Sequence, residues 1–63
     1  MCLATAYKTQ AAEGNLLMRN VQRIECHDGQ VFLTDLMDRQ VVIEGELVMA
    51  DLVENVVIVR ERG

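Results

Sequence analysis

The sequence has no proline and no tryptophan, and among its 63 residues it has one histidine, one tyrosine and one phenylalanine. One histidine and a few scattered acids leave little from which to build a water-excluded catalytic pocket. The four glycines are isolated from one another, so no glycine-rich loop is present to cradle a phosphate. We therefore expect a protein that is not an enzyme.

Cysteine is also scarce, since only Cys2 and Cys26 are present. Two cysteines are too few for the disulfide framework of a small secreted domain, and residues 1–20 lack the unbroken apolar run of a signal peptide. Charged or polar residues interrupt every hydrophobic stretch well before the roughly 20 apolar residues that a membrane span needs. We expect a cytoplasmic protein with no membrane partner.

Positive charge is the third shortage, with six Lys and Arg against ten Asp and Glu and a net charge of −4 at pH 7. Proteins that bind nucleic acid through its phosphates need clustered Lys and Arg. A local patch would have to come from Arg19, Arg23 and Arg39, with Tyr7 and Phe32 as the only aromatic stacking surfaces. Nucleic acid is therefore a disfavoured partner, and a small RNA-binding β-barrel is the alternative function.

Hydrophobic residues, by contrast, make up 51% of this short chain. Folding a domain of this size removes only roughly 60% of the surface that the unfolded chain exposes, so its core is thin and some further stabilisation is needed. Apolar surface left over on so small a domain suits a second copy of the same chain. We expect a homodimer.

Val, Ile and Thr dominate the apolar positions, which favours strands over helices. Turn-forming residues separate the apolar runs, and no long window keeps a helical period. The sequence therefore predicts one all-β domain over residues 1–63. Its expected strands are 2–8, 16–18, 21–26, 31–36, 41–44 and 56–60.

Four local signals refine this prediction. Asp28-Gly29 tolerates positive φ and predicts a tight hairpin, and Arg19-Asn20 is a candidate bulge. Gly45 interrupts a long apolar segment, as glycine does at a bulge or at the corner of a barrel. Residues 56–60 are apolar on both faces, so we expect one face to fill the barrel and the other to meet a neighbouring chain.

Cys26 and His27 are the first candidate metal ligands. Adjacent residues of a strand point to opposite faces and seldom bind one ion together, and no spacing for a closed tetrahedral zinc site exists. The alternative is a half-buried thiol beside a solvated imidazole at the end of a hairpin.

Cys2 is the second candidate, because it stands one residue from the amino terminus. Its thiolate, its backbone nitrogen and the terminal amine of Met1 can form fused chelate rings, and planar nitrogen and thiolate donors suit Ni(II) or Cu(II). A two-fold dimer would double this donor set if the segment lay near the axis. Alternatively, Cys2 is a small packing residue at the start of a strand.

Three segments resemble the small CooT family in order and spacing: residues 1–8 (MCLATAYK), 20–36 (NVQRIECHDGQVFLTDL) and 41–59 (VVIEGELVMADLVENVVIV). The likeness covers nearly the whole chain. Its features include Met1-Cys2 before a short strand, the run Leu33 to Leu36, Glu44-Gly45 and Asp51-Leu52.

This resemblance implies a small SH3-like barrel of about five to six short antiparallel strands that forms a dimer. It further implies a nickel-binding accessory protein, a metallochaperone that inserts Ni(II) into carbon monoxide dehydrogenase or another nickel enzyme. Cys2 would be the nickel ligand near the dimer interface, aided by the amine of Met1 or an adjacent backbone nitrogen. Some members of the family are described as RNA-binding, and Cys26-His27 is an addition to the simplest family pattern.

Overall fold

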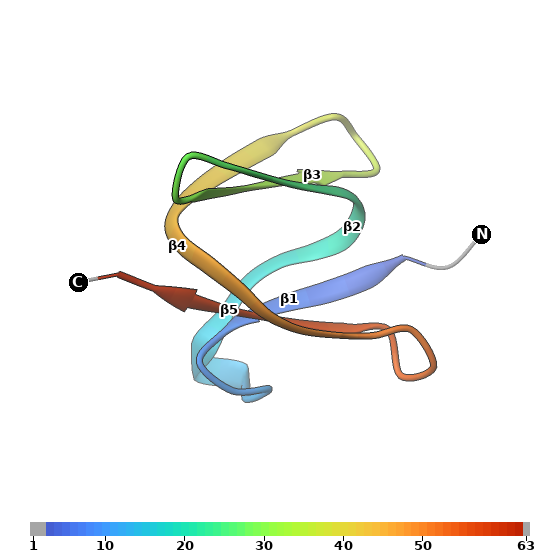
Figure 1. Cartoon of the computed structure of the whole chain (residues 1–63). Coiled ribbons are helices and arrows are strands. Elements are labelled where there is room, and N and C mark those ends of the chain that lie inside the picture. The colour runs from blue at the N-terminus through green and yellow to red at the C-terminus, as the bar shows by residue number, and fades with distance from the viewer. Residues whose placement is uncertain (1–2, 63) are drawn as a thin grey trace.

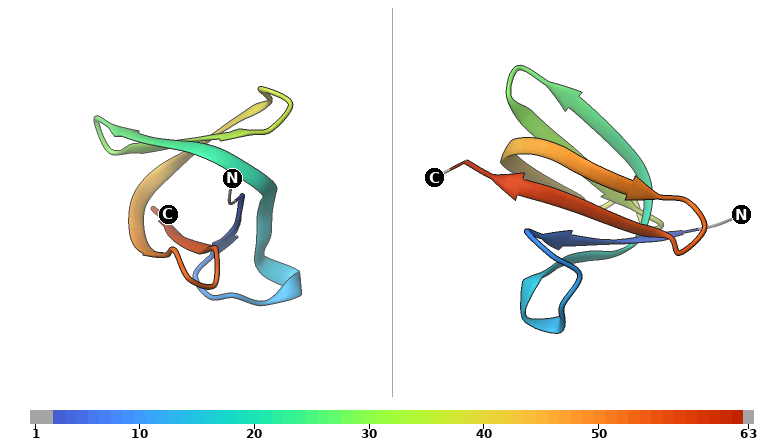
Figure 2. Two further views of the ribbon diagram at one scale, coloured as in Figure 1. Left: turned by 90° about the vertical axis from the view of Figure 1, so that its right-hand side faces the viewer. Right: turned by 60° about the horizontal axis from the view of Figure 1, so that its bottom comes forward.

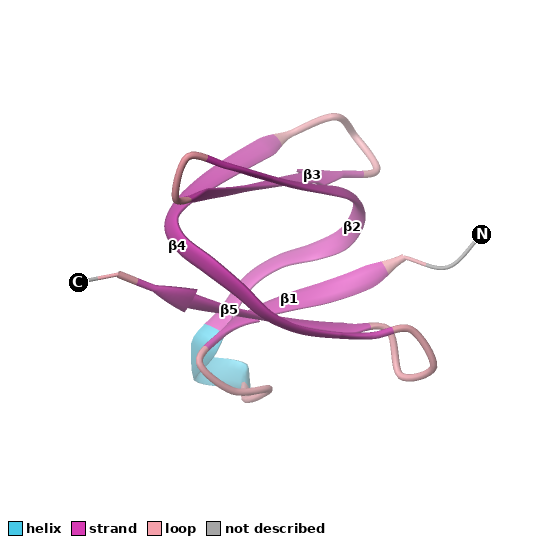
Figure 3. Cartoon of the chain, in the orientation of Figure 1, coloured by secondary structure: helices cyan, strands magenta, loops and turns pink. Residues whose placement is uncertain are grey.

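A computed structural model of the protein describes residues 3–62 and arranges them as a small β-barrel (Figure 1). The only helical segment in this range is a single 3-10 turn, η1, and no helix in it is long and apolar enough to cross a membrane (Figure 3). The elements are β1 (Ala4–Lys8), η1 (Glu13–Asn15), β2 (Leu16–His27), β3 (Gln30–Asp35), β4 (Gln40–Asp51) and β5 (Val56–Glu61). The predicted all-β class is confirmed.

The barrel closes through one parallel pairing. Each strand from β1 to β5 pairs with the next in antiparallel direction, whereas β1 pairs with β5 in parallel, from Thr5 opposite Val56 to Lys8 opposite Val59. The predicted antiparallel strands are confirmed, and one parallel pairing, between β1 and β5, closes the barrel. The reason is parity, because five strands that alternate in direction leave the first and the last running the same way.

β2 is a long strand that serves two neighbours in turn. Its first half pairs with β1, up to Val21 opposite Ala4, and its second half pairs with β3, up to His27 opposite Gln30. Asn20 has a φ of 56° and the register shifts at this point, which confirms the predicted bulge. The bend carries the strand from one half of the barrel wall to the other (Figure 2).

β4 changes partners at Gly45. Residues up to Glu44 pair with β3 and those from Gly45 onward pair with β5. Gly45 is buried, and a Cβ atom built on it would lie 1.9 Å from the carbonyl oxygen of Arg60. The predicted barrel corner is confirmed, although the strand continues through the glycine to Asp51 instead of stopping before it. Only a residue without a side chain allows β5 to approach this closely.

The hairpin between β2 and β3 turns on Asp28 and Gly29, whose φ angles are 49° and 75°. Two successive positive φ values define the tight turn that the Asp-Gly pair predicts.

The core fills the barrel with small and medium apolar side chains from all five strands. Val57 and Val59 of β5 belong to it, whereas Ile58 points to the other face and is nevertheless only 7% exposed. Ile58 stands opposite Tyr7 of β1 and Met49 of β4, so its own chain covers it and a neighbouring chain is not required there. The core residues are Ala6, Met18, Val21, Val31, Leu33, Ile43, Val57 and Val59.

One buried carboxylate organises the turn between β3 and β4. Oδ1 of Asp35 accepts hydrogen bonds from the backbone N–H groups of Met37 and Arg39, both at 2.9 Å, and Oδ2 accepts one from Nε of Arg39 at 2.8 Å. Burial alone would raise the pKa of Asp35, but these hydrogen bonds and the charge of Arg39 outweigh it and hold the pKa below the ordinary value of 3.8.

The lowered pKa of Asp35 predicts a loss of stability in acid. A carboxylate whose pKa is lower in the folded chain contributes stability that is complete above its ordinary pKa and disappears as the pH falls through the folded value, that is, below about pH 4. Asp35→Asn keeps an oxygen for the two backbone donors but faces Arg39 with an N–H group. We expect its melting temperature to be lower at pH 6 and to change less than that of the wild type between pH 6 and pH 3, as measured by circular dichroism. Equal acid sensitivity of the two proteins would contradict this role.

Gly45→Ala tests the corner of the barrel. The added methyl group meets backbone atoms of Arg60 and Glu61, which cannot rotate away, so we expect about 3 kcal/mol or more of destabilisation and a melting temperature at least roughly 12 °C lower. Gly14→Ala is the matched control, because nothing lies within 4 Å of the added atom, and its effect should stay within about 0.5 kcal/mol. Similar melting temperatures for the two variants would show that the close approach does not constrain the fold.

Candidate functional site

The described chain begins beside the turn between β4 and β5. Because β1 is parallel to β5, both strands start at the same end of the barrel, and the N–H of Thr5 donates to the carbonyl oxygen of Asn55 at 2.9 Å. Leu3 and Ala4 therefore enter next to this turn (Figure 1). Met1 and Cys2, the predicted nickel ligands, lie outside the described residues, so their role stays a prediction.

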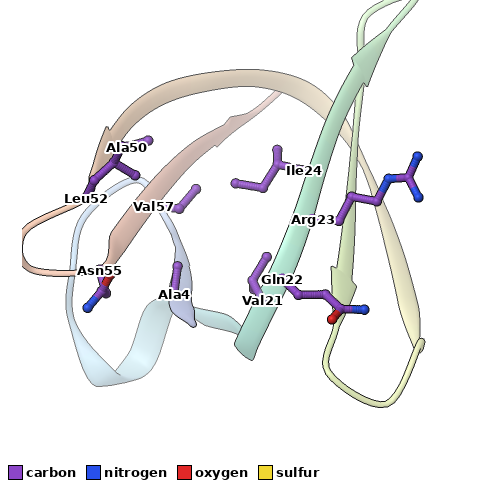
Figure 4. A pocket seen from close by; sticks show the side chains of 9 residues that line it. All are labelled: Ala4, Val21, Gln22, Arg23, Ile24, Ala50, Leu52, Asn55 and Val57. Atoms are coloured by element: carbon purple, nitrogen blue, oxygen red, sulfur yellow. The ribbon is translucent and has the colours of Figure 1, made fainter. Parts of the chain in front are cut away.

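A groove of about 430 Å³ opens at this place in the barrel wall, between β2 and β4. β2 leaves β1 to pair with β3, and β4 leaves β3 to pair with β5, so the two long strands diverge without pairing with each other. Figure 4 shows apolar side chains on either side of the opening and the guanidinium of Arg23 turned away from it. The lining residues are Ala4, Val21, Gln22, Arg23, Ile24, Ala50, Leu52, Asn55 and Val57.

Two large apolar side chains project from the turn beside this groove. Leu52 is 82% exposed and Val53 is 87% exposed, the highest values among the large hydrophobic residues of the described chain. Oδ1 of Asp51 accepts hydrogen bonds from the N–H groups of Val53 and Glu54 at 3.0 and 2.9 Å, which fixes the shape of the turn. An ordered turn thus presents Leu52 and Val53, which we call the tip.

The segment of β4 that leads to the tip also exposes apolar side chains. Leu47, Val48 and Met49 are 38%, 50% and 41% exposed, and from Gly45 onward β4 pairs with β5 alone. The acids at the two ends of this segment have partners within the chain. Arg60 hydrogen-bonds Glu46 and lowers the pKa of that carboxyl, and Asp51 caps the turn. This part of the surface therefore offers apolar contact with little free charge.

Cys26 and His27 lie at the other end of the barrel, in the β2–β3 hairpin near the last described residues (Figure 1). Cys26 is an exposed free thiol, and His27 shares its strand face with Glu25, whose Oε2 lies 3.6 Å from Nε2 of the imidazole. The imidazole also contacts the ring of Phe32 edge-on, at 5.6 Å between centroids. Within residues 3–62 no three His, Cys, Asp or Glu side chains come together as metal ligands.

Of the three arginines that an RNA-binding surface would need, Arg19 and Arg39 line one hollow beside the β3–β4 turn, and Arg23 and Arg39 each have an acidic partner. Arg23 lies 3.5 Å from Glu25, and Arg39 is bonded to Asp35. Arg19 is exposed on the first half of β2. The two aromatic residues stand on strands that are not neighbours, Tyr7 on β1 and Phe32 on β3. Among the described residues, Tyr7 and Phe32 thus do not lie on neighbouring strands as a shared stacking platform for single-stranded nucleic acid.

Reasoning from the sequence missed both the groove and the tip. The sequence predicted a turn over residues 51–55, but the exposure of the Leu52 and Val53 side chains in that turn was not predicted. Large apolar residues in a tight turn have no route to the core, and that was the available signal. The groove had no such signal, because it arises from the divergence of two strands that are far apart in the sequence.

The family model described as CO dehydrogenase accessory protein CooT matches residues 1–60 of the chain. Among solved structures, the fold is similar to the crystal structure of a candidate CooT from Carboxydothermus hydrogenoformans, with a TM-score of 0.83 and 16% identity. The match covers 98% of this chain and 100% of that chain, and it confirms the predicted small all-β fold. No curated protein matches this chain.

Proposed function

Because the chain belongs to the CooT family of CO dehydrogenase accessory proteins, we propose that it is a nickel-binding accessory protein that supplies Ni(II) to a nickel enzyme. Carbon monoxide dehydrogenase is the expected client. Cys2 is the proposed ligand, together with the amine of Met1 or the adjacent backbone nitrogen, at the interface of a homodimer. In this proposal residues 1–63 form a single domain, and the protein acts in the cytoplasm. Nickel is the cargo that it delivers and not a catalytic cofactor.

The observation that carries the proposal is the place where the described chain begins. Leu3 and Ala4 enter next to an exposed apolar tip and an apolar groove, at the end of the barrel opposite Cys26. Apolar surface of this kind is where a second protein chain packs. The first described residues therefore lie close to surface that favours association, which supports the proposed site at the start of the chain.

The donor chemistry explains why a second chain is needed. A four-coordinate nickel ion with nitrogen and thiolate donors is a suitable complex for Ni(II). Within residues 3–62 no three His, Cys, Asp or Glu side chains come together as a metal site of their own. Two copies related by a two-fold axis supply two thiolates and two nitrogens, which is a full set.

Delivery of nickel to a client enzyme also favours a metal site at the interface between two chains over a metal site inside the barrel core. The core of this barrel is filled by apolar side chains, and a metal ion there would be cut off from a client. An ion held by the starts of two chains stays accessible to incoming ligands of another protein. The family membership supports the accessory role, and the choice of nickel and of Cys2 is our proposal.

Native mass spectrometry of protein titrated with Ni(II) tests this proposal. We expect one nickel ion per dimer in the wild type and in Cys26→Ala, and none in Cys2→Ala. The affinity should rise between pH 6 and pH 9, because the thiol and the terminal amine must lose their protons to bind, and such groups in model peptides do so near about pH 8 to 8.5. Acetylation of the amino terminus should weaken binding if the amine is a donor.

Two results would contradict the proposal. Nickel that is lost with Cys26→Ala and kept with Cys2→Ala would move the site to the β2–β3 hairpin. A protein that retains no nickel at any pH in this range would leave RNA binding as the function to test, by retention on RNA at low ionic strength.

A further inference from the structure

We propose that the hollow beside the β3–β4 turn binds an acidic segment of a partner protein through Arg19 and Arg39. The inference deepens the proposed function and rests on it for the identity of the partner, because the nickel enzyme that receives the ion is the expected owner of this segment. The hollow measures about 440 Å³. Its lining residues are Leu16, Leu17, Met18, Arg19, Asn20, Asp35, Arg39 and Val41.

The hollow exists because β2 leaves β3 at the bulge. From Val21 onward β2 pairs with β3, whereas its residues before the bulge pair with β1. The β3–β4 turn continues beyond this point of divergence, and the N–H of Leu36 donates to the carbonyl oxygen of Asn20 at 2.9 Å. The turn is therefore fastened to β2, and the hollow between them is a fixed feature of the surface.

Arg39 is held in position by a buried partner. Its Nε donates to Oδ2 of Asp35 at 2.8 Å, and the Asp35 side chain is only 5% exposed. The Arg39 side chain is itself 74% exposed, so most of it remains accessible to a ligand. A guanidinium presents its donors in a rigid planar fork that matches the two oxygens of a carboxylate. Asp35 thus orients this fork before a ligand arrives, which reduces the entropy lost on binding.

Arg19 supplies the second positive charge of the hollow. It is exposed on the first half of β2, and its guanidinium forms no ion pair with any acid of the described chain. Asp35 is the acid that lines the hollow, and its two oxygens already accept three hydrogen bonds. Asp38 of the same turn lies outside the lining and accepts a hydrogen bond from Gln22. The hollow therefore offers a net positive charge to a ligand.

The charge of the whole chain makes this hollow the preferred place for an acidic partner. Ten acids and six basic residues give the chain a net charge of −4, so an acidic protein is repelled by most of its surface. Charges on exposed surfaces act over about 10 Å at 0.1 M salt, which confines the attraction to the neighbourhood of the two arginines. Such local complementarity fixes the orientation of a partner.

The apolar surroundings favour a protein segment over RNA. Leu16, Leu17 and Val41 are half-buried in the hollow, and Leu36 and Met37 are 51% and 71% exposed in the turn that borders it. None of the described lining residues is aromatic, so a base has nothing to stack on. Apolar side chains beside two arginines match a segment that carries both carboxylates and aliphatic residues.

The hollow lies near the start of the described chain. Ala4 of β1 stands opposite Val21 of β2, and Val21 stands opposite Asp35 of β3. Figure 1 shows the β3–β4 turn and the start of β1 on the same side of the barrel. A client enzyme held at this turn is thus close to the residues that directly follow the proposed nickel ligands in the sequence.

An NMR titration of the isotope-labelled full chain, without metal, tests the hollow. The probe is a short capped peptide of glutamate and leucine, and its control is the same peptide with glutamine in place of glutamate. We expect the acidic peptide to shift the amide signals of residues 16–20 and 35–41 with a Kd of about 1 mM or tighter, and the glutamine peptide to bind at least about tenfold more weakly. Shifts centred on other residues, or equal binding of the two peptides, would overturn the proposal.

Arg19→Glu tests the charge contact from the side of the protein. We expect the acidic peptide to bind about tenfold more weakly, because an attractive contact becomes a repulsive one. Arg23→Glu is the matched control, since it changes the net charge equally on the same strand but does not line this hollow. Its affinity should stay within about twofold of the wild type. Equal losses in the two variants would show that the peptide responds to net charge and would refute a site at the hollow.

Arg39→Lys tests the oriented guanidinium. Lysine keeps the positive charge but lacks the planar fork, so we expect the acidic peptide to bind at least about threefold more weakly. Circular dichroism checks that this variant is folded. Wild-type affinity in a folded Arg39→Lys would contradict the contact between the fork and a carboxylate.

Other occupants of the hollow are outcomes of the same experiments. A short RNA that causes these shifts at lower concentration than the acidic peptide would overturn the proposal in favour of nucleic acid. A sedimentation mass that changes between the wild type and Arg19→Glu would make the hollow an interface between copies of this chain, which also overturns it.

The docking site and the nickel site can fail separately. The titration contains no metal, so Cys2→Ala should bind the acidic peptide as the wild type does. A chain that binds the peptide but no nickel contradicts the proposed function alone. A chain that binds nickel through Cys2 but no acidic peptide contradicts the docking site alone.

Discussion

The parallel pairing of β1 with β5 is the constraint on which the rest of this structure depends. Five alternating strands can close a barrel only if the first and last run in the same direction, and this pairing fixes where the chain begins. The start of β1 must then lie beside the turn that leads into β5. Leu3, the apolar tip and the groove thus share one end of the barrel because of the number of strands.

The two long strands, β2 and β4, both close the small barrel and form the two sides of its groove. β2 and β4 each bend so that one strand serves two neighbours, which lets 63 residues surround a core. The bend in β4 requires the bare backbone of Gly45 against Arg60, and the bend in β2 uses the positive φ of Asn20. The same bends separate the strands on one side, so the groove between them is a consequence of closing a barrel with so few residues. An apolar groove in the wall of so small a barrel is itself a reason for a second chain to pack against it.

The sequence predicted the local features of the fold well, because single residues with strong conformational preferences determine them. Asp28-Gly29 set the hairpin, Asn20 the bulge and Gly45 the corner. The expected strands were six with 16–18 and 21–26 counted separately and five with them joined, and residues 46–50, after Gly45, were assigned to no strand. In the structure β2 and β4 each run through these places, which gives five strands and a parallel closure. Whether the backbone continues through the glycine depends on β5, which is distant in the sequence, so the parity and the position of the chain start could not be predicted from local preferences.

The candidate site also has one part that the sequence could predict and one part that depends on contacts between distant segments. Cys2 was singled out by its position in the chain and by a family resemblance that the match over residues 1–60 confirms, without any structural statement about its ligands. The groove beside the start of β1 could not be predicted from the sequence, because it joins residues from β1, β2, β4 and β5.

In the proposed dimer, nickel binding and the association of the two chains are coupled. Nickel that binds across the interface stabilises the dimer, and by the same linkage a preformed dimer raises the affinity for nickel. A client that separates the chain starts would weaken both interactions at once, and a carrier built in this way can hold its ion in isolation and still release it on contact.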